Sequence, residues 1–253
     1  MSTSGMEVRR VSAGNGWAWM VEGFALFKKS PVIWIALFII YLLIGMMLSV
    51  VKMVGPIVLN LLAPVFLAGF MLGCRALDND EELEINHLFA GFKQNTAQLI
   101  TVGGIYLAGI IVIVGIMFSG SSGTALSAIF SGQVMDPQQA AATLGDGFIF
   151  GALIGLALMV PLIMAYWFAP ALVVFHGMPA LEAMKLSFQA CLRNMLPLFV
   201  YSLISAALLV LAIIPLGLGL LVMIPTMTAS LYVSYKDIFA ITEVPQVGEI
   251  EEV

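Results

Sequence analysis

Few residues of this sequence could carry chemistry. Glu84 and His87 form a Glu-x-x-His pair, a spacing that places a carboxylate and an imidazole on one face of a helix. Di-iron helix bundles use this pair twice, together with two further glutamates, but this sequence holds a single copy. The acidic residues that precede it suit the first turn of a surface helix. We therefore expect a solvent-facing helix here and no metal centre.

The second histidine, His176, precedes Gly177 and Pro179 and has no sequence neighbours that would complete a metal site. The sequence contains no His-Glu-x-x-His zinc motif, no Gly-x-Ser-x-Gly nucleophile motif and no Walker sequence. We accordingly expect no catalytic residue, no cofactor and no metal, and the sequence predicts a protein that is not an enzyme.

The long apolar stretches carry hydroxyl and amide groups but no charged side chain. Ion pumps, proton-coupled transporters and voltage sensors place ionisable residues inside the membrane, so this pattern disfavours a coupled transporter. Most of the polar groups are expected to hydrogen-bond between helices. Lining a polar or lipid-headgroup cavity is the alternative role, and it is considered for Asn60, Thr226 and Thr228.

Composition identifies the elements that must position these groups. Of the 253 residues, 61% are hydrophobic and 10% are charged, and the mean hydropathy is +1.07. These values predict an integral membrane protein. They exclude a soluble globular enzyme, a disulfide framework and a nucleic-acid-binding protein that relies on a basic patch. The net charge of −5 arises in short acidic stretches and indicates little about partners.

Six uncharged apolar runs are long enough to cross a membrane. They cover about 32–51, 56–74, 97–118, 148–175, 198–214 and 216–235. The fourth run is too long to cross upright, so Pro161 and Pro170 are expected to kink it or to end its spanning part. The sequence thus predicts an all-α integral membrane protein with six transmembrane helices within 16–240. A disordered terminus, 1–15, precedes this domain, and an acidic tail, 241–253, follows it.

Basic residues determine the expected orientation. With six crossings, nine of the ten lie on one side of the membrane and only Lys52 lies on the other. The positive-inside rule therefore places both termini in the cytosol, and it places the loop 119–147, which has no Lys or Arg, outside. Cys74 and Cys191 fall on the cytosolic side, where thiols stay reduced, so we expect no disulfide.

The segments that lead into the first, third and fifth runs share a pattern. They read Phe24-x-x-Phe27, Phe89-x-x-Phe92 and Phe188-x-x-Cys191, and each precedes a basic and small polar cluster. Apolar residues three apart share a helix face, so each segment is predicted to be an amphipathic helix at the cytosolic interface. The expected lipid-headgroup contacts are Lys28, Lys29, Lys93 and Arg193.

The second, fourth and sixth runs share another pattern. Pro64, Pro161 and Pro225 are each followed four residues later by alanine. Each proline removes a backbone donor and clashes with the preceding turn, so each is expected to kink its helix at a common depth.

Together the two patterns predict three parallel hairpin repeats, about 17–76, 84–176 and 179–239, with the loop 119–147 as an insertion in the second. Such repeats would be related by a pseudo-threefold axis along the membrane normal. Apolar sequence also produces chance matches, and superposition of the three hairpins separates the two explanations.

The segments GWAWMVEGFALFKKSPVIWI and SLYVSYKDIF resemble an uncharacterised family of six-helix inner-membrane proteins of proteobacteria. The arrangement is more distantly similar to the membrane domain fused to some bacterial glycerophosphodiester phosphodiesterases. The resemblance covers about 11–239 and rests on membrane-approach segments, not on catalytic motifs. It implies a multi-pass protein of the bacterial inner membrane and, without a phosphodiesterase domain, no enzymatic activity.

Two functions follow as hypotheses. The first is a non-enzymatic accessory or organising protein that contacts phospholipid, other membrane proteins or further copies of itself, and no nucleic acid. The alternative is a facilitator or channel for a neutral or lipid-like substrate, with the pseudo-threefold axis as its pathway. An enzyme acting on lipid ranks third, because no acid–base pair lies at membrane depth. A polar axial cavity would favour the facilitator, and a packed apolar axis would favour the accessory role.

Overall fold

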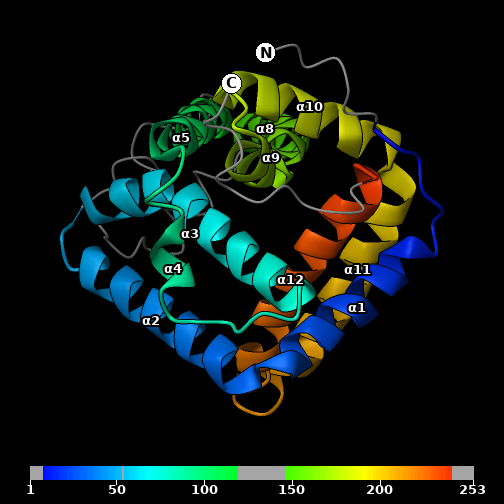
Figure 1. Cartoon of the computed structure of the whole chain (residues 1–253). Helices are drawn as coiled ribbons and strands as arrows, with labels where there is room; N and C mark the ends of the chain where they lie inside the picture. Colours follow the sequence, from blue (N-terminus) through cyan, green and yellow to red (C-terminus); the bar gives the residue numbers. More distant parts are fainter. Residues whose placement is uncertain (1–7, 53, 119–145, 241–253) are drawn as a thin grey trace, which may run out of the picture. The chain divides into compact units, whose positions relative to one another are not determined.

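The computed structural model describes residues 8–52, 54–118 and 146–240, and these residues form helices and turns without a strand. The helices are α1 (Asn15–Lys29), α2 (Pro31–Ser49), α3 (Val54–Asp78), α4 (His87–Ala90), α5 (Thr96–Phe118), α8 (Asp146–Trp167), α9 (Ala169–His176), α10 (Ala180–Arg193), α11 (Met195–Ile213) and α12 (Leu220–Ile238) (Figure 1). They divide into two compact units: Met1–Gly103 with Ala165–Val253, and Gly104–Met164. The all-α prediction is confirmed for the described residues.

Five helical stretches in the described part of the chain are long and apolar enough to cross a membrane. They are Pro31–Ser49, Val54–Asp78, Thr96–Phe118, Phe148–His176 and Met195–Ile213. The sixth expected crossing, α12, is not among them. The apolar Leu216–Gly219 stretch lies in the turn before α12, and the helix instead extends to Ile238 and takes in Lys236 and Asp237. The predicted boundary of this helix was therefore placed four residues too early.

Prolines shape two helix boundaries in the first unit. Ser30 separates α1 from α2, because a residue that precedes proline avoids the helical region and Pro31 suits the first turn of a new helix. The fourth apolar run is interrupted at Phe168, and Pro170 lies in the first turn of α9. The helix is thus interrupted beside Pro170, one of the two prolines named for this run, whereas α8 continues through Pro161. Pro64, Pro161 and Pro225 lie inside α3, α8 and α12, and their bending at a common depth stays a prediction.

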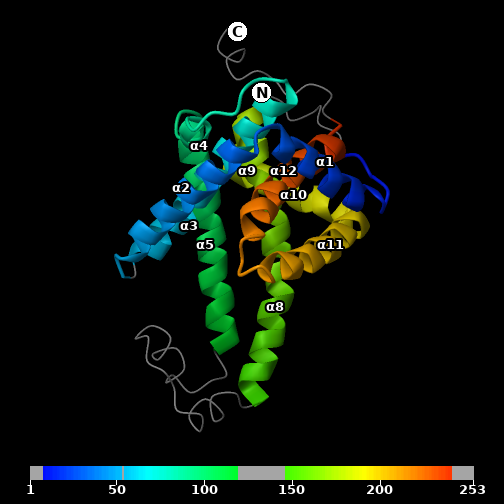
Figure 2. The same ribbon diagram turned by 90° about the horizontal axis from the view of Figure 1, so that it is seen from below.

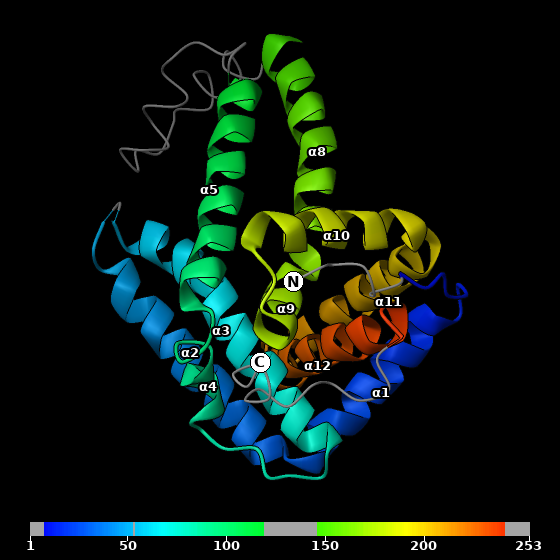
Figure 3. The ribbon, with the colours of Figure 1, turned by 45° about the horizontal axis from the view of Figure 1, so that its top comes forward.

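Helix α12 lies inside the first unit and packs on α1, and Figures 1 and 3 show the two helices side by side. Its hydroxyl-bearing residues are enclosed by protein; buried examples are Thr226, Ser230, Tyr232 and Ser234. Thr226 and Ser230 donate to the carbonyl oxygens four residues earlier, so their hydroxyl groups are satisfied within the helix. This polar content is one reason why α12 lacks the hydropathy of the other long helices.

The approach segments do not lie free at an interface. Helix α1 packs on α12, α4 packs on α3, and α10 packs on α9. Each contact includes a close approach: Gly23 meets Ser230, the backbone of Leu88 meets Gly69, and the backbone N–H of Phe168 donates to Ser187 Oγ at 2.9 Å. The second approach helix is only one turn long, much shorter than the amphipathic helix expected there.

The second unit, Gly104–Met164, consists of most of α5 and α8, which run side by side in Figure 2. Gly151 and Gly155 form a close-packing stripe on α8. A Cβ atom at Gly151 would lie 2.7 Å from the carbonyl oxygen of Met117, and one at Gly155 would lie 2.9 Å from its sulfur. Close helix packing is therefore present at this Gly-x-x-x-Gly spacing.

Candidate functional site

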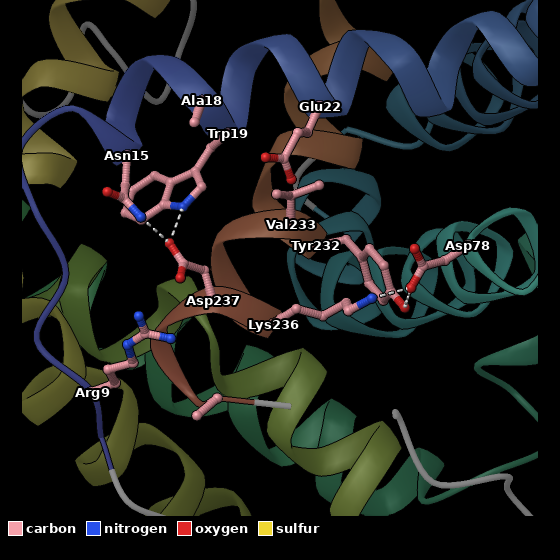
Figure 4. A pocket seen from close by; sticks show the side chains of 11 residues that line it. Arg9, Asn15, Ala18, Trp19, Glu22, Asp78, Tyr232, Val233, Lys236 and Asp237 are labelled. Carbon is pink, nitrogen blue, oxygen red and sulfur yellow. Dashed lines mark hydrogen bonds and ion pairs between the residues drawn. The ribbon is translucent and has the colours of Figure 1, made fainter. Parts of the chain in front are cut away.

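A polar pocket of about 380 Å³ lies between α1, α12 and the end of α3 (Figure 4). Ala18, Val233 and Ala240 supply its small and aliphatic lining. The polar lining comes from Arg9, Asn15, Trp19, Glu22, Asp78, Tyr232, Lys236 and Asp237. The formal charges of the lining are two cations and three carboxylates, which leave a net charge of minus one.

Helical periodicity assembles this lining. Asn15, Trp19 and Glu22 lie four and three residues apart, so they share one face of α1. Tyr232 and Lys236 are four apart on α12. Because α1 crosses α12 at Gly23 and Ser230, the two polar faces are brought opposite each other beyond the crossing.

Asp237 connects α12 to α1. Its Oδ2 atom accepts hydrogen bonds from Asn15 Nδ2 at 2.7 Å and from Trp19 Nε1 at 2.8 Å. The indole of Trp19 is almost completely buried, so this hydrogen bond satisfies a donor that would be costly to leave unpaired. Both donors are neutral, and the charge of Asp237 is therefore not cancelled by these two contacts.

Asp78, the last residue of α3, connects that helix to α12. Lys236 Nζ and Tyr232 Oη both donate to Asp78 Oδ2, the latter at 3.1 Å. The side chains of Lys236 and Asp78 are 25% and 29% exposed. Partial burial reduces screening, so this pair is stronger than a fully exposed ion pair. It holds the ends of α3 and α12 together at the pocket wall.

Two further charges at the pocket have no hydrogen bond or ion pair from their side chains within the described structure, namely Arg9 and Glu22. The backbone of Arg9 is nevertheless fixed: its N–H donates to Ile238 O at 2.8 Å, and its carbonyl oxygen accepts from Asn194 Nδ2 at 2.9 Å. Figure 4 shows Arg9 and Glu22 on different sides of the pocket. With Lys236 and Asp78 paired, the pocket presents one uncompensated cation, Arg9, and two uncompensated carboxylates, Glu22 and Asp237.

The four basic residues expected at lipid headgroups fall into two groups. Lys28, Lys93 and Arg193 are exposed. Lys28 lies over the Phe24 ring at 5.2 Å, and Arg193 Nη1 donates to Val8 O at 3.4 Å. Lys29, by contrast, is held in a protein contact with the segment after α3.

Lys29 Nζ donates to Asp80 Oδ1 at 2.6 Å and to the carbonyl oxygen of Leu77 at 2.7 Å. The hydrogen bond and the positive charge of Lys29 lower the pKa of Asp80. The structure thus gives Lys29 a role in joining α1 to the end of α3, which its position in a basic cluster did not indicate.

The expected cavity residues do not come together in one cavity. Asn60 lines a groove along α2 and α3, and its Nδ2 donates to the carbonyl oxygen of Pro56 at 2.9 Å. Thr228 lines a separate pocket of about 200 Å³, surrounded by aromatic side chains of α2 and α3. Thr226 is buried, and its hydroxyl donates to Val222 O at 2.7 Å. The two threonines and the asparagine mainly satisfy their own helices.

Aromatic rings fill the space between α9 and α12. Phe175 stacks on Tyr235 with ring centroids 5.6 Å apart and meets Tyr232 edge-on at 6.2 Å, and all three side chains are buried. His176 Nε2 lies 2.5 Å from Tyr235 Oη. This part of the first unit is therefore packed and not hollow.

The Glu84–His87 pair makes a local contact. The backbone N–H of Glu84 donates to His87 Nδ1 at 3.0 Å, which caps the turn before α4. Within residues 8–52, 54–118 and 146–240, no cluster of three or more His, Cys, Asp or Glu residues has the geometry to hold a metal ion.

Sequence reasoning missed the pocket itself. Arg9 and Lys236 entered only among the basic residues that determine the expected orientation. The polar spacing of Asn15, Trp19 and Glu22 along one helix face was the available signal, but it does not reveal which distant helix lies opposite.

Comparison with known proteins gives one clear similarity. A probable inner membrane protein of Burkholderia thailandensis is 33% identical over 261 residues, an alignment that covers 94% of this chain and 96% of the relative. No family model matches the sequence, and no solved structure matches it significantly.

Proposed function

This chain belongs to the family of that probable inner membrane protein, and from this premise we propose that it is a non-enzymatic accessory protein whose basic surface binds anionic phospholipid at the cytosolic face. Its apolar helices sit in a lipid bilayer. The binding surface consists of Lys28, Lys93 and Arg193, which we call the basic contact residues.

The observation that carries this proposal is the pairing of exposed charge with exposed aromatic surface on the approach segments. Phe24 and Phe89 are each 42% exposed, beside Lys28 and near Lys93 respectively. Exposed aromatic rings favour the headgroup boundary, where their apolar faces leave water and nearby Lys or Arg residues meet phosphate. Each such charge near an anionic leaflet contributes about 1 kcal/mol.

The proposal includes six crossings and a threefold repeat. Helix α12 has 19 residues, which span about 28 Å at 1.5 Å per residue, close to the thickness of a hydrocarbon core. The helix contacts also support a cyclic arrangement: each approach helix, α1, α4 or α10, packs on the return helix of the preceding hairpin, α12, α3 or α9. Three hairpins about a pseudo-threefold axis, with α1 closing the ring onto α12, account for this order.

The test replaces the basic contact residues together, as Lys28→Gln, Lys93→Gln and Arg193→Gln. Anionic lipid retained by the purified protein is measured by native mass spectrometry. Loss of three charges should weaken binding of phosphatidylglycerol by about 3 kcal/mol at most, roughly a hundred-fold. The matched control is Lys29→Gln, which should change retention little because Lys29 is already paired with Asp80.

These charges also determine topology, so orientation must be verified for the variant. Retention equal to that of the native protein would refute the lipid-contact role and leave the three residues as topology signals. Weaker binding at high salt is a further expectation, because exposed charges are screened.

A facilitator for a lipid-like substrate is the second candidate function. The observation in its favour is that the aromatic pocket and the groove along α2 and α3 share the lining residues Tyr41 and Ala63, so two mostly apolar hollows lie next to each other. The packed rings of Phe175, Tyr232 and Tyr235 count against a pathway between α9 and α12. Lipid flip-flop in proteoliposomes, measured by dithionite quenching of a fluorescent phospholipid, distinguishes the candidates: rates equal to protein-free vesicles exclude the facilitator.

A further inference from the structure

The polar pocket between α1, α12 and the end of α3 has a rigid frame. Asp237 is fixed by Asn15 and Trp19, and Asp78 is fixed by Lys236 and Tyr232. These contacts tie α12 to α1 and to the end of α3, and they satisfy part of the lining. The pocket volume, about 380 Å³, lies within the range of pockets that bind small ligands.

The lining favours a ligand that carries both a positive and a negative group. Lys236 and Asp78 neutralise each other, so an anion alone would face the carboxylates of Glu22 and Asp237, and a cation alone would face Arg9. The groups left uncompensated are the guanidinium of Arg9, the carboxylate of Glu22 and Asp237 Oδ1, which makes no hydrogen bond to a described residue. Because Arg9 and Glu22 approach from different sides, a zwitterion with separated charges matches the pocket best (Figure 4).

The position of the pocket favours a phosphate as the anionic group. Asp78 is the last residue of α3, a helix that can cross the membrane, so the pocket lies at the end of a membrane span. Head groups occupy this depth in a bilayer. The planar guanidinium of Arg9 offers two parallel donors, which suits phosphate oxygens.

We propose that this pocket binds the phosphoethanolamine group, with the phosphodiester at Arg9 and the primary ammonium between Glu22 and Asp237. The group has two sources: the head group of phosphatidylethanolamine within the bilayer, and soluble glycerophosphoethanolamine. The site is separate from the basic contact residues, because none of Lys28, Lys93 and Arg193 lines it.

The experiment uses the full chain with Glu22→Gln and, separately, Arg9→Gln. Both side chains are exposed and make no hydrogen bond or ion pair with a described residue, so the variants should fold as the native protein does. The matched controls are Glu182→Gln and Lys185→Gln, exposed charges of α10 that lie outside the pocket. Thermal unfolding in detergent verifies the fold of each variant.

Two binding measurements separate the sources. Native mass spectrometry compares retention of phosphatidylethanolamine with that of phosphatidylglycerol, and isothermal titration measures binding of glycerophosphoethanolamine. We expect preferential retention of phosphatidylethanolamine, reduced at least tenfold by Glu22→Gln and by Arg9→Gln and unchanged in the controls. Binding of the lipid alone assigns the site to a bilayer lipid, and binding of both compounds shows that the head group suffices.

Failure to bind either compound, or equal binding in the pocket variants and the controls, would overturn the proposal. The outcome is independent of the basic contact residues. The triple variant of Lys28, Lys93 and Arg193 should lose phosphatidylglycerol and keep phosphatidylethanolamine, so the two proposals can fail separately.

Discussion

The crossing of α1 over α12 depends on the absence of a side chain at Gly23. A Cβ atom at this position would lie 2.6 Å from the backbone nitrogen of Ser230 and 2.8 Å from its Cα. These are main-chain atoms, which cannot rotate away as the end of a flexible side chain can. Gly23→Ala should therefore force the two helices apart.

The expected magnitude combines two opposing effects. Overpacking of a tight interface costs about 1–3 kcal/mol. Alanine in place of glycine inside a helix returns up to about 1 kcal/mol. Separation also disturbs the buried contacts of Trp19, Met20 and Phe27 on the same face of α1. We expect a net loss of about 1–2 kcal/mol in the free energy of unfolding.

Gly45→Ala in α2 is the matched control. A Cβ atom there would meet nothing nearer than Leu59 Cδ2 at 3.9 Å, so this variant should be neutral or slightly more stable. Titration with sodium dodecyl sulfate in dodecylmaltoside micelles, followed by tryptophan fluorescence, gives the free energies of unfolding. Equal stability of Gly23→Ala and Gly45→Ala would show that the close crossing of α1 and α12 is absent in the folded protein.

Three further predictions concern the thiols, an ion pair and the topology. Cys74 and Cys191 are buried, and burial raises the pKa of Cys191 to about 12, so both thiols should resist maleimide at pH 8 until the protein is unfolded. Rapid labelling of Cys191 in the native protein would contradict the packing of α10 on α9. Lys29 lowers the pKa of Asp80 from 3.8, so their ion pair stabilises the fold above that pH and loses this contribution as the pH falls through the lowered pKa. Asp80→Asn should therefore remove this part of the acid dependence of the free energy of unfolding. An unchanged pH profile of unfolding in Asp80→Asn would contradict this role of the ion pair. A thiol at Gly132→Cys, with the native cysteines replaced, should react with an impermeant reagent added to intact cells; labelling only after the membrane is broken would invert the orientation.

Properties that depend on local composition could be read from the sequence. Apolar runs of sufficient length predicted membrane helices, and five such stretches are present. Pro170 predicted the interruption of the fourth run, because proline acts on the backbone where it stands. The inner-membrane assignment agrees with the relative from Burkholderia thailandensis.

Boundaries and approach helices were predicted less well. Hydropathy does not distinguish an apolar turn from an apolar helix, so the start of α12 was placed at Leu216 instead of Leu220. The aromatic spacing of Phe89 and Phe92 suggested a full amphipathic helix, but α4 is one turn long. A short helix persists there because its backbone lies against Gly69 of α3, a tertiary contact that the local pattern does not contain.

By itself the sequence determined that this protein is helical, apolar and membrane-embedded, because backbone groups in lipid must be satisfied within each helix. Only the tertiary structure decided the partners of its charged residues. Asn15 and Asp237 are separated by almost the whole chain, and they meet because Gly23 lets α1 cross α12 closely. Hydrogen bonds and ion pairs depend on distances of a few ångströms between such segments, so the polar pocket arises only once the helices are packed.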